Sequence, residues 1–201
     1  MKVWRIAGRH FADPPPADWR QRLATRLGER PRRVGAWVEL ALYGALQCLD
    51  DAGETRLPDT ALLSLCTLHG PDIALRAALA EARDGLPLPI GFLTSQPGQV
   101  LPALARYLDW HGEGRCLSSR APALALQLAC VEAGPAGLLA GWVDEDEAGR
   151  SLWLRLLPEP GPAPTLVCGA FETLADPAVT HLALSGAQLH LARSTLESAH
   201  G

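Results

Sequence analysis

The sequence is poor in basic residues other than arginine. Lys2 is the only lysine among 201 residues, and the formal net charge is −4 with neutral histidines. A protein that binds nucleic acids in general needs a basic face to neutralise their phosphates. The charge balance therefore argues against a nucleic-acid-binding function.

Long hydrophobic runs are also missing. The longest nearly uncharged run with a helical pattern, residues 121–131, is too short to cross a bilayer. The first nine residues mix apolar and basic side chains and are followed by a proline-rich segment, unlike a signal peptide. Apolar residues make up 48% of the chain and charged residues 20%, which excludes disorder over most of it. We expect a folded cytoplasmic protein with no membrane span.

The spacing of the five cysteines matches no metal-binding pattern. The count is odd, there is no C-x-x-C pair, and the spacings match no zinc site. A free thiol among apolar neighbours behaves as a small hydrophobe. We therefore expect buried, reduced cysteines, and neither a metal nor a cofactor. The five are Cys48, Cys66, Cys116, Cys130 and Cys168.

Hydrophobic periodicity predicts an alternation of strands and helices. Helices are predicted over residues 34–49, 72–83, 100–110 and 121–133, and strands over 3–7, 60–68, 115–117, 136–143, 151–157 and 166–169. Residues 181–191 fit a strand and residues 188–198 fit a helix, so the segment 181–198 stays ambiguous. Strands that alternate with helices favour an α/β fold, here a mostly parallel five-stranded sheet with helices on both faces and an antiparallel closing hairpin. Because the helix over 121–133 is apolar all round, we expect it to be buried centrally. A domain over 1–160 and a C-terminal extension over 161–201, packed on the domain or on a partner, complete the prediction.

Four segments in this order resemble a known family. They are residues 28–33 (GERPRR) before the first long helix, 67–70 (TLHG), 86–92 (LPLPIGF) with Ser95 three residues on, and 141–145 (GWVDE). Over residues 28–158 they are similar to the N-terminal half of the thiolase-like condensing enzymes. The nearest resemblance is to the chain-length-factor-like β-ketoacyl synthase relatives of aryl polyene and xanthomonadin pigment pathways.

The resemblance places a serine where condensing enzymes carry a catalytic cysteine. In those enzymes a thiolate at the N-terminus of an apolar helix attacks the acyl thioester. Aligning residues 124–129 with that helix puts Ser119 at the nucleophile position, with Ser118 as the nearest alternative. Cys116 falls three residues too early and would lie within the preceding strand. The family's second half supplies two catalytic histidines, and the residues after 161 are too few to form it.

The resemblance therefore implies a non-catalytic subunit of a type II fatty acid or polyketide-type synthase. Such a chain-length-factor-like subunit would pair with a ketosynthase, or with itself, through the strand over 115–117, shape the acyl-chain tunnel and contact an acyl carrier protein. Arg30, Arg32 and Arg33 form the densest basic cluster and are the candidate carrier-protein contact. Phe92 and Ser95 are candidates for an acyl-pocket loop.

Two other functions remain open from the sequence. Ser119 or Ser118 with His69 or His111 could form a serine acyltransferase or thioesterase, although a serine before a helix is more often a cap and no G-x-S-x-G elbow surrounds it. A carrier-protein-binding scaffold without an acyl pocket is the third possibility. The acidic residues 144–147 are expected to be a solvated hairpin turn, without a calcium pattern.

Overall fold

The computed structural model describes residues 2–85, 88–146, 148–161, 164–185 and 188–194. Its helices are α1 (Trp19–Leu27), α2 (Ala36–Asp51), α3 (Asp72–Arg83), α4 (Pro89–Thr94), α5 (Val100–Tyr107) and α6 (Pro122–Glu132), with short 3₁₀ turns η1 (Pro97–Gln99) and η2 (Phe171–Ala175). Its strands are β1 (Val3–Ala12), β2 (Leu62–Thr67), β3 (Gly114–Ser118), β4 (Leu138–Asp144), β5 (Arg150–Pro158), β6 (Val167–Gly169), β7 (Val179–Ser185) and β8 (Gln188–Arg193). None of the described helices has the length and apolar character needed to cross a bilayer.

All eight of these strands form one sheet, in the order β3-β2-β4-β5-β1-β7-β8-β6. Only β2 pairs in parallel, with β3 and with β4, and the other pairings are antiparallel. The prediction of an α/β fold is confirmed, but that of a mostly parallel five-stranded sheet is wrong. The reason is that β1 does not lie beside β2: it inserts between β5 and β7 and is antiparallel to both.

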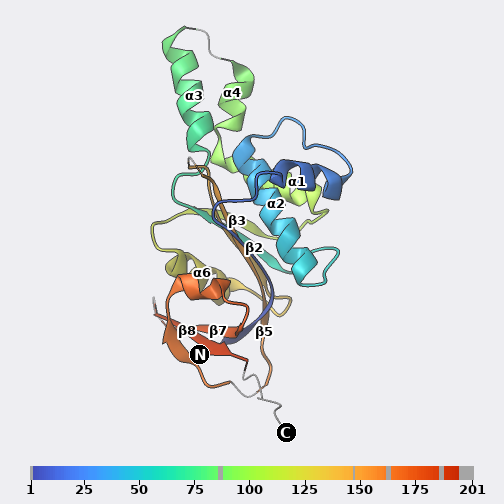
Figure 1. The fold of residues 1–201 in the computed structure, drawn as a ribbon, viewed down its shortest axis with the longest axis vertical. Helices are drawn as coiled ribbons and strands as arrows, with labels where there is room; N and C mark the ends of the chain where they lie inside the picture. Colours follow the sequence, from blue (N-terminus) through green and yellow to red (C-terminus); the bar gives the residue numbers. More distant parts are fainter. Residues whose placement is uncertain (1, 86–87, 147, 162–163, 186–187, 195–201) are drawn as a thin grey trace.

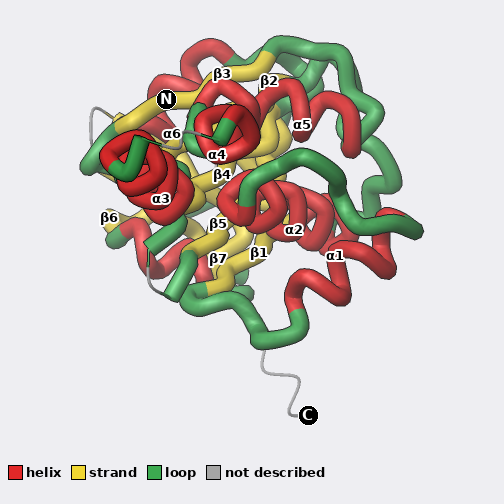
Figure 2. Tube along the Cα trace, turned by 90° about the horizontal axis from the view of Figure 1, so that it is seen from above, coloured by secondary structure: helices red, strands yellow, loops and turns green. Residues whose placement is uncertain are grey.

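Helices cover both faces of the sheet, as predicted, and the buried apolar side chains of the described residues form two large clusters and one small one. Figure 2 shows α1, α2 and α5 on one side of the sheet. Successive side chains of each strand point to opposite faces, so each strand contributes side chains to the clusters on both faces. Leu63 and Leu65 of β2 pack towards α2, whereas Leu62 of the same strand packs with α6. The helix α1, which is not among the predicted helices, buries Trp19 and Leu23 against α2.

Close packing of α2 on the sheet depends on two glycines. The indole of Trp153 lies between Gly44 of α2 and Gly141 of β4, where an added Cβ would approach the ring to 2.4 and 2.7 Å respectively. The Trp153 Nε1–H donates to the Ser151 hydroxyl (3.2 Å), which in turn donates to the Leu40 carbonyl (3.1 Å). The indole is thus enclosed and its polar group is satisfied.

The C-terminal region belongs to the same sheet. The ambiguous segment 181–198 contains the end of β7 and all of β8, so the helix alternative is wrong for residues 188–193, and 195–198 lie outside the described residues. β7 pairs with β1, which links this region to the N-terminus. The division of the chain at residue 160 stays a prediction.

The environment of His10 on β1 predicts a pH-dependent stability. Its Nε2 is buried without a hydrogen-bond partner, its ring packs edge-on against Tyr43 at 5.2 Å between centroids, and burial lowers its pKa from 6.5 to about 4. Between these values the unfolded chain binds a proton that the folded chain does not, so stability should fall as the pH drops from 6.5 to 4. Allowing for the ring's partial exposure, we expect a loss of roughly 2–3 kcal/mol.

Denaturant unfolding at a series of pH values checks this expectation. The variant His10→Phe keeps an aromatic ring against Tyr43 but cannot titrate, so the difference between the two curves isolates the histidine from the carboxylates. Parallel curves for the two proteins between pH 6.5 and 4 would refute the assignment.

Candidate functional site

The carboxyl ends of β2, β3 and β4 lie together along one side of the sheet, beside the start of α6. This carboxyl edge is distinct from the edge strand β3. Among parallel strands, this is the edge where ligands usually bind. Thr67 ends β2 and pairs with Ser118, the last residue of β3. Ser118 and the adjacent Ser119 therefore lie at this edge.

Ser119 is engaged in the turn that leads from β3 into α6. Its backbone N–H donates to the Thr67 carbonyl (3.0 Å), and its hydroxyl accepts a hydrogen bond from the Ala121 N–H (3.1 Å). Ala121 is the N-cap residue of α6. The side chain thus satisfies a backbone donor at the entry to the helix, while the equivalence of Ser119 to the family's nucleophile stays a prediction.

The two candidate bases lie at opposite ends of the sheet. His69 follows β2 at the same edge as the serines, whereas His111 precedes β3 and lies near Asp59 at the other end. His69 lines a hollow with Asp72, Arg76 and Glu145 on the α3 side. In the described part of the chain, no hydrogen bond joins either serine to a histidine.

The cysteines offer no activated thiol at this edge. All five are free, and Cys116 lies within β3, as predicted. Burial raises the pKa of Cys66 to about 11 and that of Cys130 to about 12, and it also raises the pKa of Cys116. A thiol that resists ionisation is a poor nucleophile. The expectation of buried cysteines is wrong for Cys168, which is exposed at the far edge strand β6.

Asp144, at the end of β4, organises the edge. Its side chain is 3% exposed, and Oδ1 accepts hydrogen bonds from the Thr67 hydroxyl (2.7 Å) and from the backbone N–H groups of Leu68 and His69 (2.8 Å each). Oδ2 accepts the Trp142 Nε1–H at 2.8 Å. One carboxylate therefore holds the loop after β2 against β4.

Glu145 is also buried, at 7% exposure, and faces the first turn of α3. Burial raises the pKa of its carboxyl group, and its Oε2 has no hydrogen-bond partner among the described residues. The nearby backbone N–H groups of Ile73 and Ala74 act in the opposite direction, to a smaller extent. Such first-turn donors have no partner within their own helix. Asp144 therefore anchors the edge and Glu145 lies buried beside α3, so the prediction that they belong to a solvated turn is wrong. Glu147, from the same acidic run, lies outside the described residues.

Two helices, α3 and α4, project from this edge (Figure 1). Phe92 on α4 is 63% exposed, whereas the Ser95 side chain is buried and its hydroxyl donates to the Phe92 carbonyl (2.8 Å). The prediction of a loop is therefore wrong for Phe92, which lies in the helix α4, and residues 86 and 87 of that segment lie outside the described residues. The hairpin exposes further large apolar side chains, namely Ile73, Leu75, Leu79, Leu88, Ile90 and Leu93. An exposed apolar surface of this size is typical of an interaction site.

The helix α6 also exposes apolar side chains, which contradicts the prediction that it is buried on all sides. Leu126 and Ala129 pack on the sheet, whereas Leu124, Leu128 and Val131 are exposed, Val131 to 76%. The spacing of the exposed three places them on one helical face. Their burial requires a second layer that the described residues do not supply.

The arginine cluster divides into paired and unpaired side chains. Arg30 pairs with Glu39 (3.3 Å), which also pairs with Arg20. Arg32 and Arg33 have no ion pair among the described residues. The Arg32 backbone N–H donates to the Tyr107 hydroxyl (3.2 Å), which brings the exposed end of α5 beside the cluster.

Comparison with known proteins identifies the fold. No protein-family model and no curated protein matches the sequence. A chain of the complex of the ketosynthase ApeO with its chain length factor ApeC from Xenorhabdus doucetiae superposes with a TM-score of 0.57 at 11% identity, over 96% of this chain and all of that one. A chain of the complex AntDE:AntF, a type II polyketide synthase carrier protein with its ketosynthase, gives 0.58 at 10% identity, over 91% of this chain and 67% of that one.

A third structure, the ishigamide ketosynthase/chain length factor, gives a TM-score of 0.53 at 14% identity, over 78% of this chain and 59% of its own. This chain thus spans about three fifths of the longer structure and the whole of the matched ApeO–ApeC chain. The resemblance predicted from the four sequence segments is confirmed at the level of the fold, which is that of ketosynthases and chain length factors.

Proposed function

We propose that the chain is a non-catalytic, chain-length-factor-like subunit that pairs with a ketosynthase and helps to shape the tunnel for a growing acyl chain. The pathway class is a type II fatty acid or polyketide synthase of the aryl polyene kind. The observation that carries the proposal is the sheet edge at β3 and the neighbouring apolar face of α6, which no described residue of the chain covers. The similarity of the fold to chains from ketosynthase and chain length factor complexes supports it.

The pairing surface follows from two adjacent elements. β3 is the end strand of the sheet, so one row of its backbone N–H and C=O groups is open to another strand. The Arg115 side chain of β3 contacts Glu132 at the end of α6, so the exposed face of α6 lies beside this edge. A partner strand added to β3 would extend the sheet, and the partner's apolar side chains would cover α6.

Phe92 and the rest of the α3–α4 hairpin are the proposed contribution of this chain to the acyl-chain tunnel. The buried Ser95 hydroxyl closes the C-terminal turn of α4, while Phe92 points its apolar ring outward. Aromatic side chains bury large areas when a partner packs against them, so Phe92 is suited to contribute to an interface beside the tunnel. The five free cysteines agree with the reducing cytoplasm as the site of this assembly.

Co-expression with the ketosynthase encoded nearest to this chain, followed by size-exclusion chromatography, tests the proposal. We expect the two proteins to elute together as a heterodimer at micromolar concentration. Separate elution of two folded proteins would contradict it.

Arg32 and Arg33 are the proposed contact for an acidic acyl carrier protein. Both lack an ion pair in the described structure, and Arg33 has a φ of 60°, where glycine would be less strained. An arginine at such a position is consistent with a function for its side chain. Replacing both by alanine should weaken carrier-protein binding about tenfold and reduce its salt dependence.

Isothermal titration of the heterodimer with the carrier protein at two salt concentrations measures this effect. Arg83→Ala, which removes an exposed arginine from α3, is the control and should leave the affinity unchanged. An Arg32→Ala/Arg33→Ala variant that binds as tightly as the unmodified protein would exclude the cluster as the contact.

A further inference from the structure

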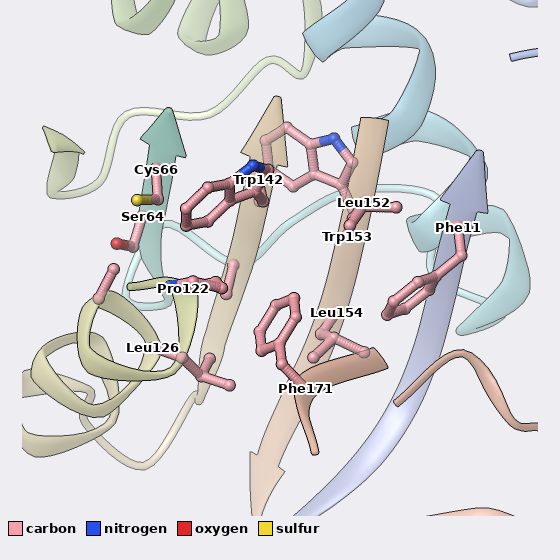
Figure 3. A pocket seen from close by; sticks show the side chains of 13 residues that line it. Phe11, Ser64, Cys66, Pro122, Leu126, Trp142, Leu152, Trp153, Leu154 and Phe171 are labelled. Atoms are coloured by element: carbon pink, nitrogen blue, oxygen red, sulfur yellow. The ribbon is translucent and has the colours of Figure 1, made fainter. Parts of the chain in front are cut away.

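The hollows of the molecule differ in the chemistry of their walls. One lies on the α6 face and is a mainly apolar slot that includes Trp142 and Phe171 (Figure 3). Two others lie beside the start of α3 and the turn between β4 and β5, and both are lined by Ile73, Glu145 and Asp146. Their volumes, about 240 and 180 Å³, are below those of most drug-sized pockets. These two neighbouring hollows are therefore candidates for a small polar group.

Glu145 is a buried acid without a counter-charge. The residue is 7% exposed, and its Oε2 is covered by protein atoms but accepts no hydrogen bond from the described residues. A buried charge is costly unless a group of opposite charge lies beside it. Because Glu145 lines both hollows, a cation in either one would lie close to this carboxylate. The group that the site needs is thus a positive one.

The larger hollow has an excess of acids. Asp72, Glu145 and Asp146 line it together with His69, and the arginine in its wall, Arg76, is paired with Asp72 at 2.7 Å. Glu145 and Asp146 have no ion pair in the described part of the chain. A cleft lined mainly by charges of one sign concentrates ions of the opposite sign. The potential in this hollow therefore favours a cation.

The smaller hollow adds an apolar wall. Leu40 and Trp19 line it, and the Ile73 side chain, which is 52% exposed, is common to both hollows. The arginine of this wall, Arg20, is already paired with Glu39 at 3.2 Å, and its guanidinium lies 4.4 Å from the centroid of the Trp19 ring. Its charge is thus balanced elsewhere. A cationic head group beside the acids would have hydrocarbon surface close by.

We propose that this site binds a primary alkylammonium group, with its charge beside Glu145 and Asp146 and its hydrocarbon stem against Ile73 and Leu40. An ammonium group is a compact charge with three hydrogen-bond donors. An alkyl stem gains from leaving water at the apolar wall, whereas a metal ion would not. A small aliphatic amine and a lysine side chain of another protein both carry this group. The site uses neither β3 nor the exposed face of α6, so it does not depend on the pairing with a ketosynthase.

Titration of the isotope-labelled full chain with n-butylammonium chloride, followed by NMR at constant chloride concentration, tests the proposal. We expect saturable shifts of the backbone amide signals of Ile73, Asp146 and Gly149, with millimolar affinity. n-Butanol, which lacks the charge, should cause no saturable shift of these signals. Nα-acetyl-lysine methylamide distinguishes the two sources. Equal affinity assigns the site to a lysine side chain, and binding of n-butylammonium alone assigns it to a small amine.

Three variants locate the binding. Glu145→Gln keeps the shape of the side chain but removes its charge, and it should weaken n-butylammonium binding about tenfold. The matched control Asp84→Asn removes an exposed carboxylate at the other end of α3 and should leave the affinity unchanged. Ile73→Trp narrows both hollows from a half-exposed position and should abolish binding while circular dichroism reports an unchanged fold. The proposal is overturned if n-butylammonium does not bind, if Glu145→Gln binds it as tightly as the unmodified chain, or if calcium chloride shifts the same signals at lower concentration.

Discussion

Replacing Leu128 and Val131 by glutamate is expected to abolish pairing with the ketosynthase while leaving the chain folded. Both side chains lie on the exposed face of α6, so the monomer loses no core packing. In the proposed complex the two residues become buried, and each large apolar side chain contributes about 1.5–3 kcal/mol when it is removed from water. Burial of two carboxylates adds a further penalty, so affinity should fall at least a hundredfold.

The opposite edge of the sheet provides a matched control. Val167 on β6 is 62% exposed, and Val167→Glu places the same charge on the same residue type at the far end of the strand order. Size-exclusion chromatography and equilibrium sedimentation should show an intact heterodimer with Val167→Glu and separate proteins with Leu128→Glu/Val131→Glu. Equal behaviour of the two variants would place the interface elsewhere.

Asp144→Ala should destabilise the chain by about 4 kcal/mol. The carboxylate accepts hydrogen bonds from the Thr67 hydroxyl, two backbone N–H groups and the Trp142 indole, and its removal leaves these donors unpaired in a buried place. Each unsatisfied donor costs about 1–3 kcal/mol, reduced where water can enter. The loop after β2 should also loosen, because Asp144 alone joins it to β4 through side-chain hydrogen bonds among the described residues.

Denaturant unfolding monitored by tryptophan fluorescence measures the loss. Asp146→Ala is the control, because Asp146 is exposed and accepts only the Gly149 N–H (2.8 Å) in the described structure. It should cost no more than about 1 kcal/mol. Losses of the same size in both variants would mean that Asp144 does not organise the edge.

Much of the secondary structure could be predicted from the chain because its apolar spacing is regular. The helix over 72–83 coincides with α3, and the predicted hairpin of 136–143 and 151–157 is formed by β4 and β5. The helix α1 was missed because only Trp19 and Leu23 of it are buried, too few to stand out from its arginines. The types of most elements therefore followed from local pattern, while several boundaries, such as the end of β1, and the pairing of strands did not.

Strand order could not be predicted, because pairing depends on contacts between distant segments. β1 pairs with β5 and β7, both more than a hundred residues later. The burial of Arg155 also depends on a distant contact. It lies in an apolar strand, is 1% exposed, and pairs with Glu54 at 2.8 Å. A buried ion pair of this kind leaves no periodic signal in the chain.

The edge residues were identified by resemblance, but their roles were only partly predicted. Residues 141–145 were singled out as a family-like segment, yet the acids at its end were expected in a solvated turn. Burial of Asp144 depends on donors from the β2 loop, and Glu145 lies beside the first turn of α3; both segments lie about 70 residues earlier. A run of acids carries no sign of such donors, and only the assembled fold places them together.

Hydrogen–deuterium exchange of β3 tests the pairing most directly. In the free chain one row of amides along Gly114–Ser118 faces no strand in the described structure, so it should exchange quickly. If the ketosynthase pairs through β3, these amides and those of α6 should become strongly protected when the ketosynthase is added. A stable complex in which the β3 amides exchange as fast as in the free chain would contradict pairing through β3.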